Sequence, residues 1–234
     1  MELEGRGFGS LLCSYPWGAL FFLVRPIAYV QGNLLSTTAT TLYQTIDRIT
    51  RDLDIKDKAI YIPPYSREAN LPQQFKGLKE TVIFMPKEKD QASPSIEEMA
   101  TGKFITRNPK GVILNPPGSG YLDQIEKLLK SNVTKTTLED LCTTLPQIVL
   151  ENLQLAKDIE LKTQNNMIHL KTTDSIYQKL YEQDLKTVKI LGDPLTSAIA
   201  CTIAKTTGKR LTIATISIIP ETQTLEATYE LIEG

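Results

Sequence analysis

The feature that most constrains this chain is an apolar stretch near its N-terminus, FGSLLCSYPWGALFFLVRPIAYV, which covers residues 8–30. No charged residue occurs from Phe8 to Val24, and the residues after Arg25 are again mostly apolar. A helix that crosses a bilayer needs about 20 apolar residues. The stretch reaches this length when the arginine side chain extends its charge toward the membrane surface. The sequence therefore predicts a hydrophobic membrane-anchor segment over residues 1–32.

Two other interpretations of this stretch stay open. Pro16 and Gly18 interrupt the apolar run, which also suits a helix that is buried in the core of the protein. A cleaved signal peptide has a basic start and a small-residue cleavage site, whereas this chain begins MELEGRG. Arginine and lysine are more frequent after the stretch than before it, so the positive-inside rule places the main domain in the cytoplasm. The predicted localisation is a membrane, with the main domain facing the cytoplasm.

Apolar residues recur at helical spacing directly after the apolar stretch. Alternating steps of four and three residues predict one amphipathic helix within residues 33–57, with Asn33 or Ser36 as its N-cap. The opposite, polar face of this helix includes Asp47. A seam this narrow either packs on the body of the domain or forms a coiled coil with a second copy. The seam residues are Leu35, Ala39, Leu42, Ile46, Ile49 and Leu53.

Composition and charge exclude several functional classes. The 234 residues are 41% hydrophobic and 23% charged, as in globular proteins, and their formal net charge of -1 offers no basic field for nucleic acid. His169 is the single histidine, so a metal site built from several histidines is excluded, and strand alternation places it on a solvent face with Lys171. Cys13, Cys142 and Cys201 are far apart and odd in number, which indicates neither a disulfide framework nor a zinc site.

A glycine-rich turn follows an apolar strand in KGVILNPPGSGYLDQIEKLLKSN, residues 110–132. Many phosphate-binding proteins share this order of strand, glycine loop and helix. A Walker loop would need lysine after Gly120, where this chain has Tyr121, and a dinucleotide fingerprint would need glycine in place of Asp123. We therefore expect a tight turn that caps the next helix. Ser119 and Gly120 stay open as an anion site at the start of that helix.

Alternating and helical patterns predict an α+β fold, in which the two N-terminal helices precede a mixed domain over residues 58–234. Residues 58–120 form a strand-rich part. Residues 121–234 follow the order helix, helix, strand, strand, helix, helix, strand, strand. We expect antiparallel hairpins that pack against the helices.

The most buried helix is expected in GDPLTSAIACTIAKTTGKRLTI, residues 192–213. Asp193 is a suitable N-cap, Pro194 suits the first helical position, and Gly208 suits the end of the helix. The small apolar residues between them suit close packing on a sheet.

This segment and the element order of residues 121–234 resemble the 4-vinyl-reductase-type domains and the small TRAPP transport-particle subunits. In those families a similar glycine-ended helix leads into a closing hairpin. The resemblance implies a ligand-binding fold with an apolar pocket under the helix, lined by Ile199, Cys201 and Ile203. The metal ligands of the 4-vinyl-reductase-type domains do not carry over, because the final hairpin has no cysteine.

The whole chain also resembles a family of uncharacterised archaeal membrane-anchored proteins that carry a similar GDPLTSAIACTIAKTTGK segment. This resemblance implies an anchor and supplies no activity.

We expect a membrane-anchored, non-catalytic module that binds a partner protein or an apolar small ligand such as a lipid. The first alternative is a homo-oligomeric assembly protein that uses the seam of residues 35–53. The second is an enzyme with a carboxylate-based site, for which Glu97–Glu98, Glu139–Asp140 and Asp193 are available. Adjacent carboxylates on a helix point in different directions, which favours capping and surface roles. We predict no catalytic residue, no cofactor and no metal.

Overall fold

The computed structural model describes residues 16–55, 58–64, 80–89, 93–129, 133–183 and 185–232. Within the first range, only the backbone is described for residues 16–29 and 31. The first part of the predicted anchor, residues 1–15, lies outside the described residues.

The described strands form one 8-stranded sheet in the order β3-β4-β2-β1-β7-β8-β6-β5. Every neighbouring pair is antiparallel, so the predicted α+β class with antiparallel hairpins is confirmed. The strands are β1 (Ile60–Ile62), β2 (Val82–Pro86), β3 (Ile105–Arg107), β4 (Lys110–Leu114), β5 (Asp158–Gln164), β6 (Met167–Thr173), β7 (Arg210–Ile219) and β8 (Thr224–Ile232).

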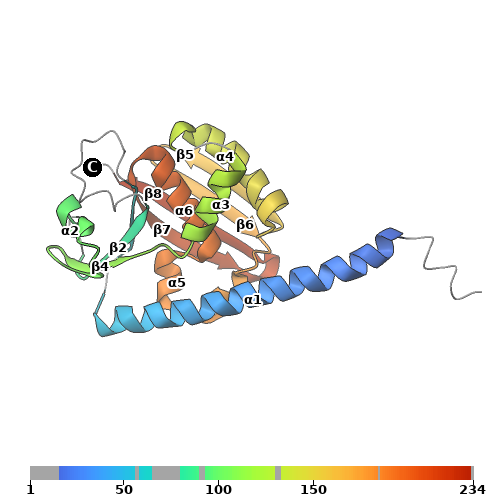
Figure 1. Cartoon of the computed structure of the whole chain (residues 1–234), viewed down its shortest axis with the longest axis horizontal. Coiled ribbons are helices and arrows are strands. Elements are labelled where there is room, and N and C mark those ends of the chain that lie inside the picture. The colour runs from blue at the N-terminus through green and yellow to red at the C-terminus, as the bar shows by residue number, and fades with distance from the viewer. Residues whose placement is uncertain are drawn as a thin grey trace, which may run out of the picture.

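Most helices cover one face of the sheet, where α6 packs on β7, α3 packs on α6 and α4 packs on β5 (Figure 1), whereas Met99 of α2 packs with Ile62 and Phe84 in a separate cluster on the other face. The α-helices are α1 (Pro16–Asp52), α2 (Ile96–Ala100), α3 (Ser119–Leu129), α4 (Leu138–Gln147), α5 (Lys186–Leu191) and α6 (Pro194–Thr207). The shorter helical turns are η2 (Val133–Lys135), η3 (Ile148–Leu153), η4 (Gln178–Gln183) and η5 (Pro220–Thr222).

The β5–β6 hairpin shows why one face of the sheet is covered and the other is open. Ile159 and Leu161 of β5 are buried on the helical side, and the residues between them are exposed. In β6, Ile168 and Leu170 are buried while His169 is exposed, as the alternation predicted. The strands therefore have an apolar face toward the helices and a polar face toward solvent.

Helix α6 forms the centre of the core, and its predicted ends are confirmed. The Asp193 side chain caps its first turn, Pro194 is its first residue, and Gly208 ends it in the left-handed conformation with φ 66°. All residues from Pro194 to Ala204 are buried. Small and apolar residues on all sides suit a helix inside the core, and α6 lies between the sheet and helix α3.

Helix α1 is one continuous helix from Pro16 to Asp52, and part of it extends away from the domain (Figure 1). Asn33 and Ser36 lie inside this helix, so the predicted N-cap is wrong. The helix also runs through residue 32, where we expected the anchor segment to end. Its C-terminal half packs against α5 and η4.

The buried face of α1 differs from the predicted seam. Asp47 was predicted on the polar face, but it is buried because the Thr187 side chain and backbone give its carboxylate hydrogen-bond donors. A buried carboxylate needs such partners, and periodicity of apolar residues does not reveal them. The residues of α1 that are buried are Ser36, Ala39, Tyr43, Ile46, Asp47 and Thr50.

In the described part of the chain, none of the helices combines the length and apolar character that a membrane crossing requires. The membrane-spanning part of the predicted fold class is therefore not supported by the described helices.

Three local details shape the helical segments. After Asp174 the chain forms the 3-10 turn η4 and then the short helix α5. The N-cap of α4 is Thr137, whose hydroxyl accepts from the Asp140 amide and donates to the Asp140 carboxylate. Pro146 lies inside α4, which ends at the next residue and continues as the wider π-helical turn η3. The missing amide of proline explains why the regular helix does not continue.

Candidate functional site

A cluster of tyrosines surrounds the start of α6. Tyr43 of α1 donates a hydrogen bond to the backbone oxygen of Gly192. Tyr61 of β1 donates to the backbone oxygen of Leu191 at 2.5 Å. Tyr229 of β8 donates to the backbone oxygen of Thr196 at 2.9 Å. Side chains from three distant parts of the chain thus bind the backbone on both sides of the α6 N-terminus.

The carboxylate of Asp193 lies at the centre of this cluster and is almost completely buried. One oxygen accepts from the amides of Leu195 and Thr196 at 2.7 and 3.1 Å. The other oxygen accepts from the hydroxyls of Thr196 and Tyr181, both at 2.8 Å. These four donors occupy the carboxylate, so the geometry assigns Asp193 to capping α6 and fixing its neighbours.

Burial raises the pKa of the tyrosines in this cluster well above the usual value. Burial is the largest cause for Tyr43, Tyr181 and Tyr229, and the nearby Asp193 raises each of these pKa values further. Burial likewise raises the pKa of the Cys201 thiol. These groups therefore stay protonated, whereas a general base or a thiolate nucleophile must lose its proton.

The glycine-rich turn before α3 packs against α6. A Cβ at Gly118 would lie 2.1 Å from the backbone nitrogen of Ala198, so only glycine fits this approach. The amide of Gly118 donates to the Ser197 hydroxyl at 3.2 Å. The amide of Ser119 donates to the backbone oxygen of Pro116 at 3.0 Å. The turn is thus explained by helix packing.

Of the two residues predicted as an anion site, Ser119 is partly buried and Gly120 is exposed at the start of α3. That site stays a prediction.

The predicted pocket lining lies in the packed core. Ile199, Cys201 and Ile203 are all fully buried and belong to the main hydrophobic cluster. The prediction that an apolar ligand binds against them stays a prediction.

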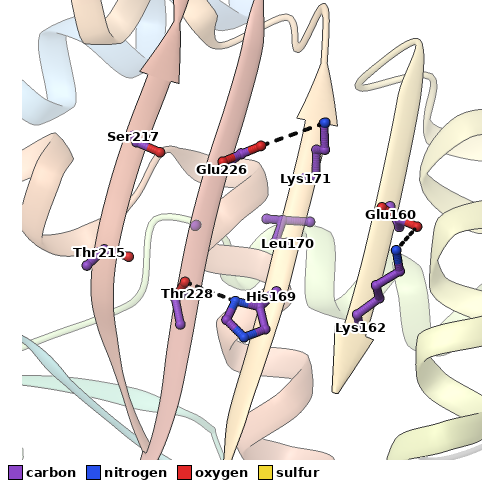
Figure 2. Close-up of a pocket in the computed structure, with 10 residues that line it drawn as sticks. Glu160, Lys162, His169, Leu170, Lys171, Thr215, Ser217, Glu226 and Thr228 are labelled. Carbon is purple, nitrogen blue, oxygen red and sulfur yellow. Dashed lines mark hydrogen bonds and ion pairs between the residues drawn. The ribbon is translucent and has the colours of Figure 1, made fainter. Parts of the chain in front are cut away.

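A hollow of about 310 Å³ lies on the opposite, open face of the sheet (Figure 2). Its lining comes from β5, β6, β7 and β8, with the polar side chains standing up from the strands as Figure 2 shows. The lining residues are Glu160, Lys162, His169, Leu170, Lys171, Thr215, Ser217, Glu226, Ala227 and Thr228.

Ion pairs and a hydrogen bond organise the side chains of this hollow. Lys162 lies 2.6 Å from Glu160 on the same strand. Lys171 of β6 lies 3.7 Å from Glu226 of β8. His169 Nδ1 lies 3.2 Å from the Thr228 hydroxyl, also between β6 and β8. The face offers donors, acceptors and charges of both signs, which suits the binding of a polar surface or ligand.

The predicted oligomer seam is divided between core and solvent. Ala39 and Ile46 are buried, and Leu53 packs against the main cluster. Ile49 is half-buried. Leu35 and Leu42 are exposed, as are the neighbouring Val30 and Leu34. The exposed part of the seam, Leu35 and Leu42, is thus a short apolar stripe on one side of α1.

The tyrosine cluster was not predicted from the sequence. Tyr61 occupies an apolar position in the alternating segment AIYI, and Tyr43 follows Leu42 on the predicted helix. Tyrosines at inward positions of amphipathic elements are a signal for buried hydroxyls that need partners. Their convergence on one helix terminus could not be read from spacing, because they are far apart in the chain.

A family model described as a domain of unknown function, DUF7982, matches residues 16–228. The chain belongs to this family. The match begins at the first residue of α1 and ends within β8, so the extended helix is part of the family domain. Comparison with the curated proteins gave no match, and comparison with the solved structures gave none either. The resemblance to the 4-vinyl-reductase-type and TRAPP domains therefore stays a prediction.

Proposed function

We propose that this member of the DUF7982 family is a non-catalytic module, tethered to a membrane through its N-terminal apolar stretch, which binds a partner protein or small ligand. The observation that carries the proposal is the continuity of α1 from that stretch into the core. A continuous helix transmits the position of an anchored N-terminus directly to the domain. In this proposal the domain faces the cytoplasm.

The contacts of α1 support a rigid connection. Tyr43 hydrogen-bonds the backbone oxygen of Gly192, and Asp47 accepts from the amide and hydroxyl of Thr187. These bonds are buried and join α1 to helix α5 and to Gly192, which follows α5. A helix held by buried polar bonds can pivot against the domain only by breaking them.

The tether itself rests on the sequence of residues 8–30. Its first part precedes the described residues, and no described helix has the character of a membrane span. In this proposal the attachment uses the whole apolar stretch of residues 8–30.

The open face of the sheet supports a binding role. Its hollow combines two ion pairs with the His169–Thr228 contact on a rigid antiparallel sheet. Binding residues placed on strands are held more firmly than those on loops. The buried tyrosine cluster supports the non-catalytic part of the proposal. Its hydroxyl groups bind backbone oxygens and the carboxylate of Asp193, which accepts four hydrogen bonds.

Vesicle flotation tests the tether. We expect the full chain to float with vesicles of phosphatidylcholine and phosphatidylglycerol. The double variant Phe21→Asp with Leu23→Asp should remain at the bottom of the gradient, because an aspartate at the centre of a membrane helix costs about 3 kcal/mol. Leu42→Asp is the matched control, since it places the same charge on an exposed position of the same helix and should float. A parent chain that fails to float would overturn the proposal.

A second candidate function is assembly through α1. The exposed apolar stripe of Leu35 and Leu42, which are seven residues apart on one side of α1, favours it, because a second helix could cover these side chains. The light-scattering mass of Leu42→Asp separates the two proposals. Assembly through the stripe predicts a lower mass for this variant, whereas the tether alone predicts an unchanged mass.

A further inference from the structure

Strand β5 is a long edge strand of the sheet, and helix α4 packs against it. It stands last in the strand order, pairs with β6, and has no other partner among the described strands. It contains 7 residues, whereas β3 at the other edge contains 3. A long edge strand presents unpaired backbone groups that can bind another strand, and short edges avoid this.

The register shows which backbone groups of β5 point outward. The amide of Leu231 donates to the Asn166 oxygen, and that of Asp174 donates to the Gln223 oxygen, both at 3.0 Å. In an antiparallel ladder such bonds recur at every second residue, so the even-numbered residues of β6 face β8. The odd-numbered residues of β6 therefore face β5.

In the β5–β6 register, odd-numbered residues of β6 lie opposite even-numbered residues of β5, as His169 lies opposite Lys162. The even-numbered residues of β5 thus direct their backbone groups to β6. The backbone groups of Ile159, Leu161 and Thr163 point to the open edge.

We propose that β5 pairs antiparallel with β5 of a second copy of this chain, about a two-fold axis at Leu161. Leu161 then exchanges both backbone hydrogen bonds with Leu161 of the partner subunit. Ile159 and Thr163 form the flanking bonds with Thr163 and Ile159 of the partner subunit. The two sheets become one continuous sheet, which is the isologous arrangement of a closed dimer.

Charge complementarity selects this partner and this register. Glu160 and Lys162 flank Leu161 on the open face, with 52% and 68% of their side chains exposed. The two-fold axis at Leu161 places Glu160 opposite Lys162 of the partner subunit, and Lys162 opposite Glu160 of the partner subunit. Opposite charges across an antiparallel pair are favourable. At the ends of the pair, Asp158 lies opposite the partner's Gln164, so no like charges meet.

Other registers of the β5 pair are unfavourable because they oppose like charges or invert one sheet. An axis at Glu160 places like carboxylates opposite each other, and an axis at Lys162 does the same for ammonium groups. A shift of one residue places Leu161 opposite a charged residue and inverts the faces of the two sheets. The register with its axis at Leu161 keeps Leu161 on the helical side in both copies and places only opposite charges across the axis on the open face.

Charge-reversal variants of the full chain test the proposal. Their association is measured by sedimentation velocity at low salt, with all samples in the same mild detergent. The parent should be a dimer. Glu160→Lys and Lys162→Glu should each weaken the dimer by about tenfold or more, because each places two like-charge pairs across the axis. The double variant should regain the parent affinity. A mixture of the two single variants should also form a dimer, because every cross-strand pair is then opposite in sign.

Both substitutions lie on exposed side chains, so circular dichroism spectra should show that each variant keeps the fold of the parent. Identical masses for the parent and all variants, whether monomeric or oligomeric, would overturn the proposal. Loss of the dimer in the double variant or in the mixture would overturn it as well, because the strand register would then not be the one described. Association through α1 would be the same in all of these samples, because none of them changes α1. The variant Leu42→Asp tests that association separately.

Discussion

Two glycines separated by one residue meet different surroundings at the start of α3. A Cβ at Gly118 would lie 2.1 Å from the Ala198 nitrogen and 2.6 Å from the Pro194 oxygen. A Cβ at Gly120 would meet nothing within 4 Å. The first glycine is therefore required by the approach of the turn to α6, and the second is not.

Alanine at these two positions gives a matched pair. Gly118→Ala should lower the free energy of unfolding by about 3 kcal/mol, because backbone atoms of a buried helix must move. Gly120→Ala should raise it by about 0.5–1 kcal/mol, because alanine is the better helix former at an open position. Urea denaturation measures both. Equal effects for the two variants would contradict the close packing of the turn on α6.

At the scale of elements, α1 shows how a helix with a regular apolar pattern is placed by its polar residues. The side of α1 that faces the domain includes Tyr43 and Asp47, which bond Gly192 and Thr187. Leu42, which follows the apolar spacing, is 46% exposed. Buried hydrogen bonds therefore set the rotation of the helix.

Aspartate at two positions of α1 tests this rotation. Ile46→Asp should lower the thermal midpoint strongly, because the carboxylate enters a buried position without a partner, at a cost of about 3 kcal/mol or more. Leu42→Asp should change the free energy of unfolding by less than about 0.5 kcal/mol, since its side chain reaches water. Circular dichroism melts measure both. If Leu42→Asp unfolds the domain and Ile46→Asp does not, the described rotation of α1 is wrong.

At the scale of the whole molecule, the tyrosine cluster joins α1, β1, β8 and η4 to the start of α6. Its hydroxyls stay protonated in the folded state because burial raises their pKa values. In the unfolded chain tyrosine loses its proton near its usual pKa of about 10. The unfolded state therefore binds fewer protons than the folded state above this pH, and stability falls as pH rises.

Alkaline denaturation tests this linkage. The contribution of the cluster should be fully present below about pH 10 and should decline above it, by up to about 1.4 kcal/mol per pH unit for each buried tyrosine. Tyr43→Phe should be less stable than the parent at neutral pH, because it loses the bond to Gly192, but less sensitive to pH above 10. Urea midpoints measured from pH 8 to about pH 11 show the difference in slope. Equal slopes would contradict the buried, protonated state of Tyr43.

The sequence by itself determined the α+β class, the principal strands and hairpins and both ends of α6. Local signals carry this information: alternation gives the faces of β5 and β6, and Asp193, Pro194 and Gly208 mark the helix. The sequence also located the exposed His169 correctly. These features depend on neighbours in the chain, so periodicity and capping chemistry are sufficient to predict them.

Only the tertiary structure decided the rotation of α1, the packing role of Gly118 and the convergence of the tyrosines on α6. Tyr43, Tyr61 and Tyr229 reach one helix terminus from distant parts of the chain. Each of these contacts is a partnership between remote residues, and a single sequence does not encode which remote donor meets which acceptor. The same holds for the order of the strands in the sheet, which makes β5 an edge strand.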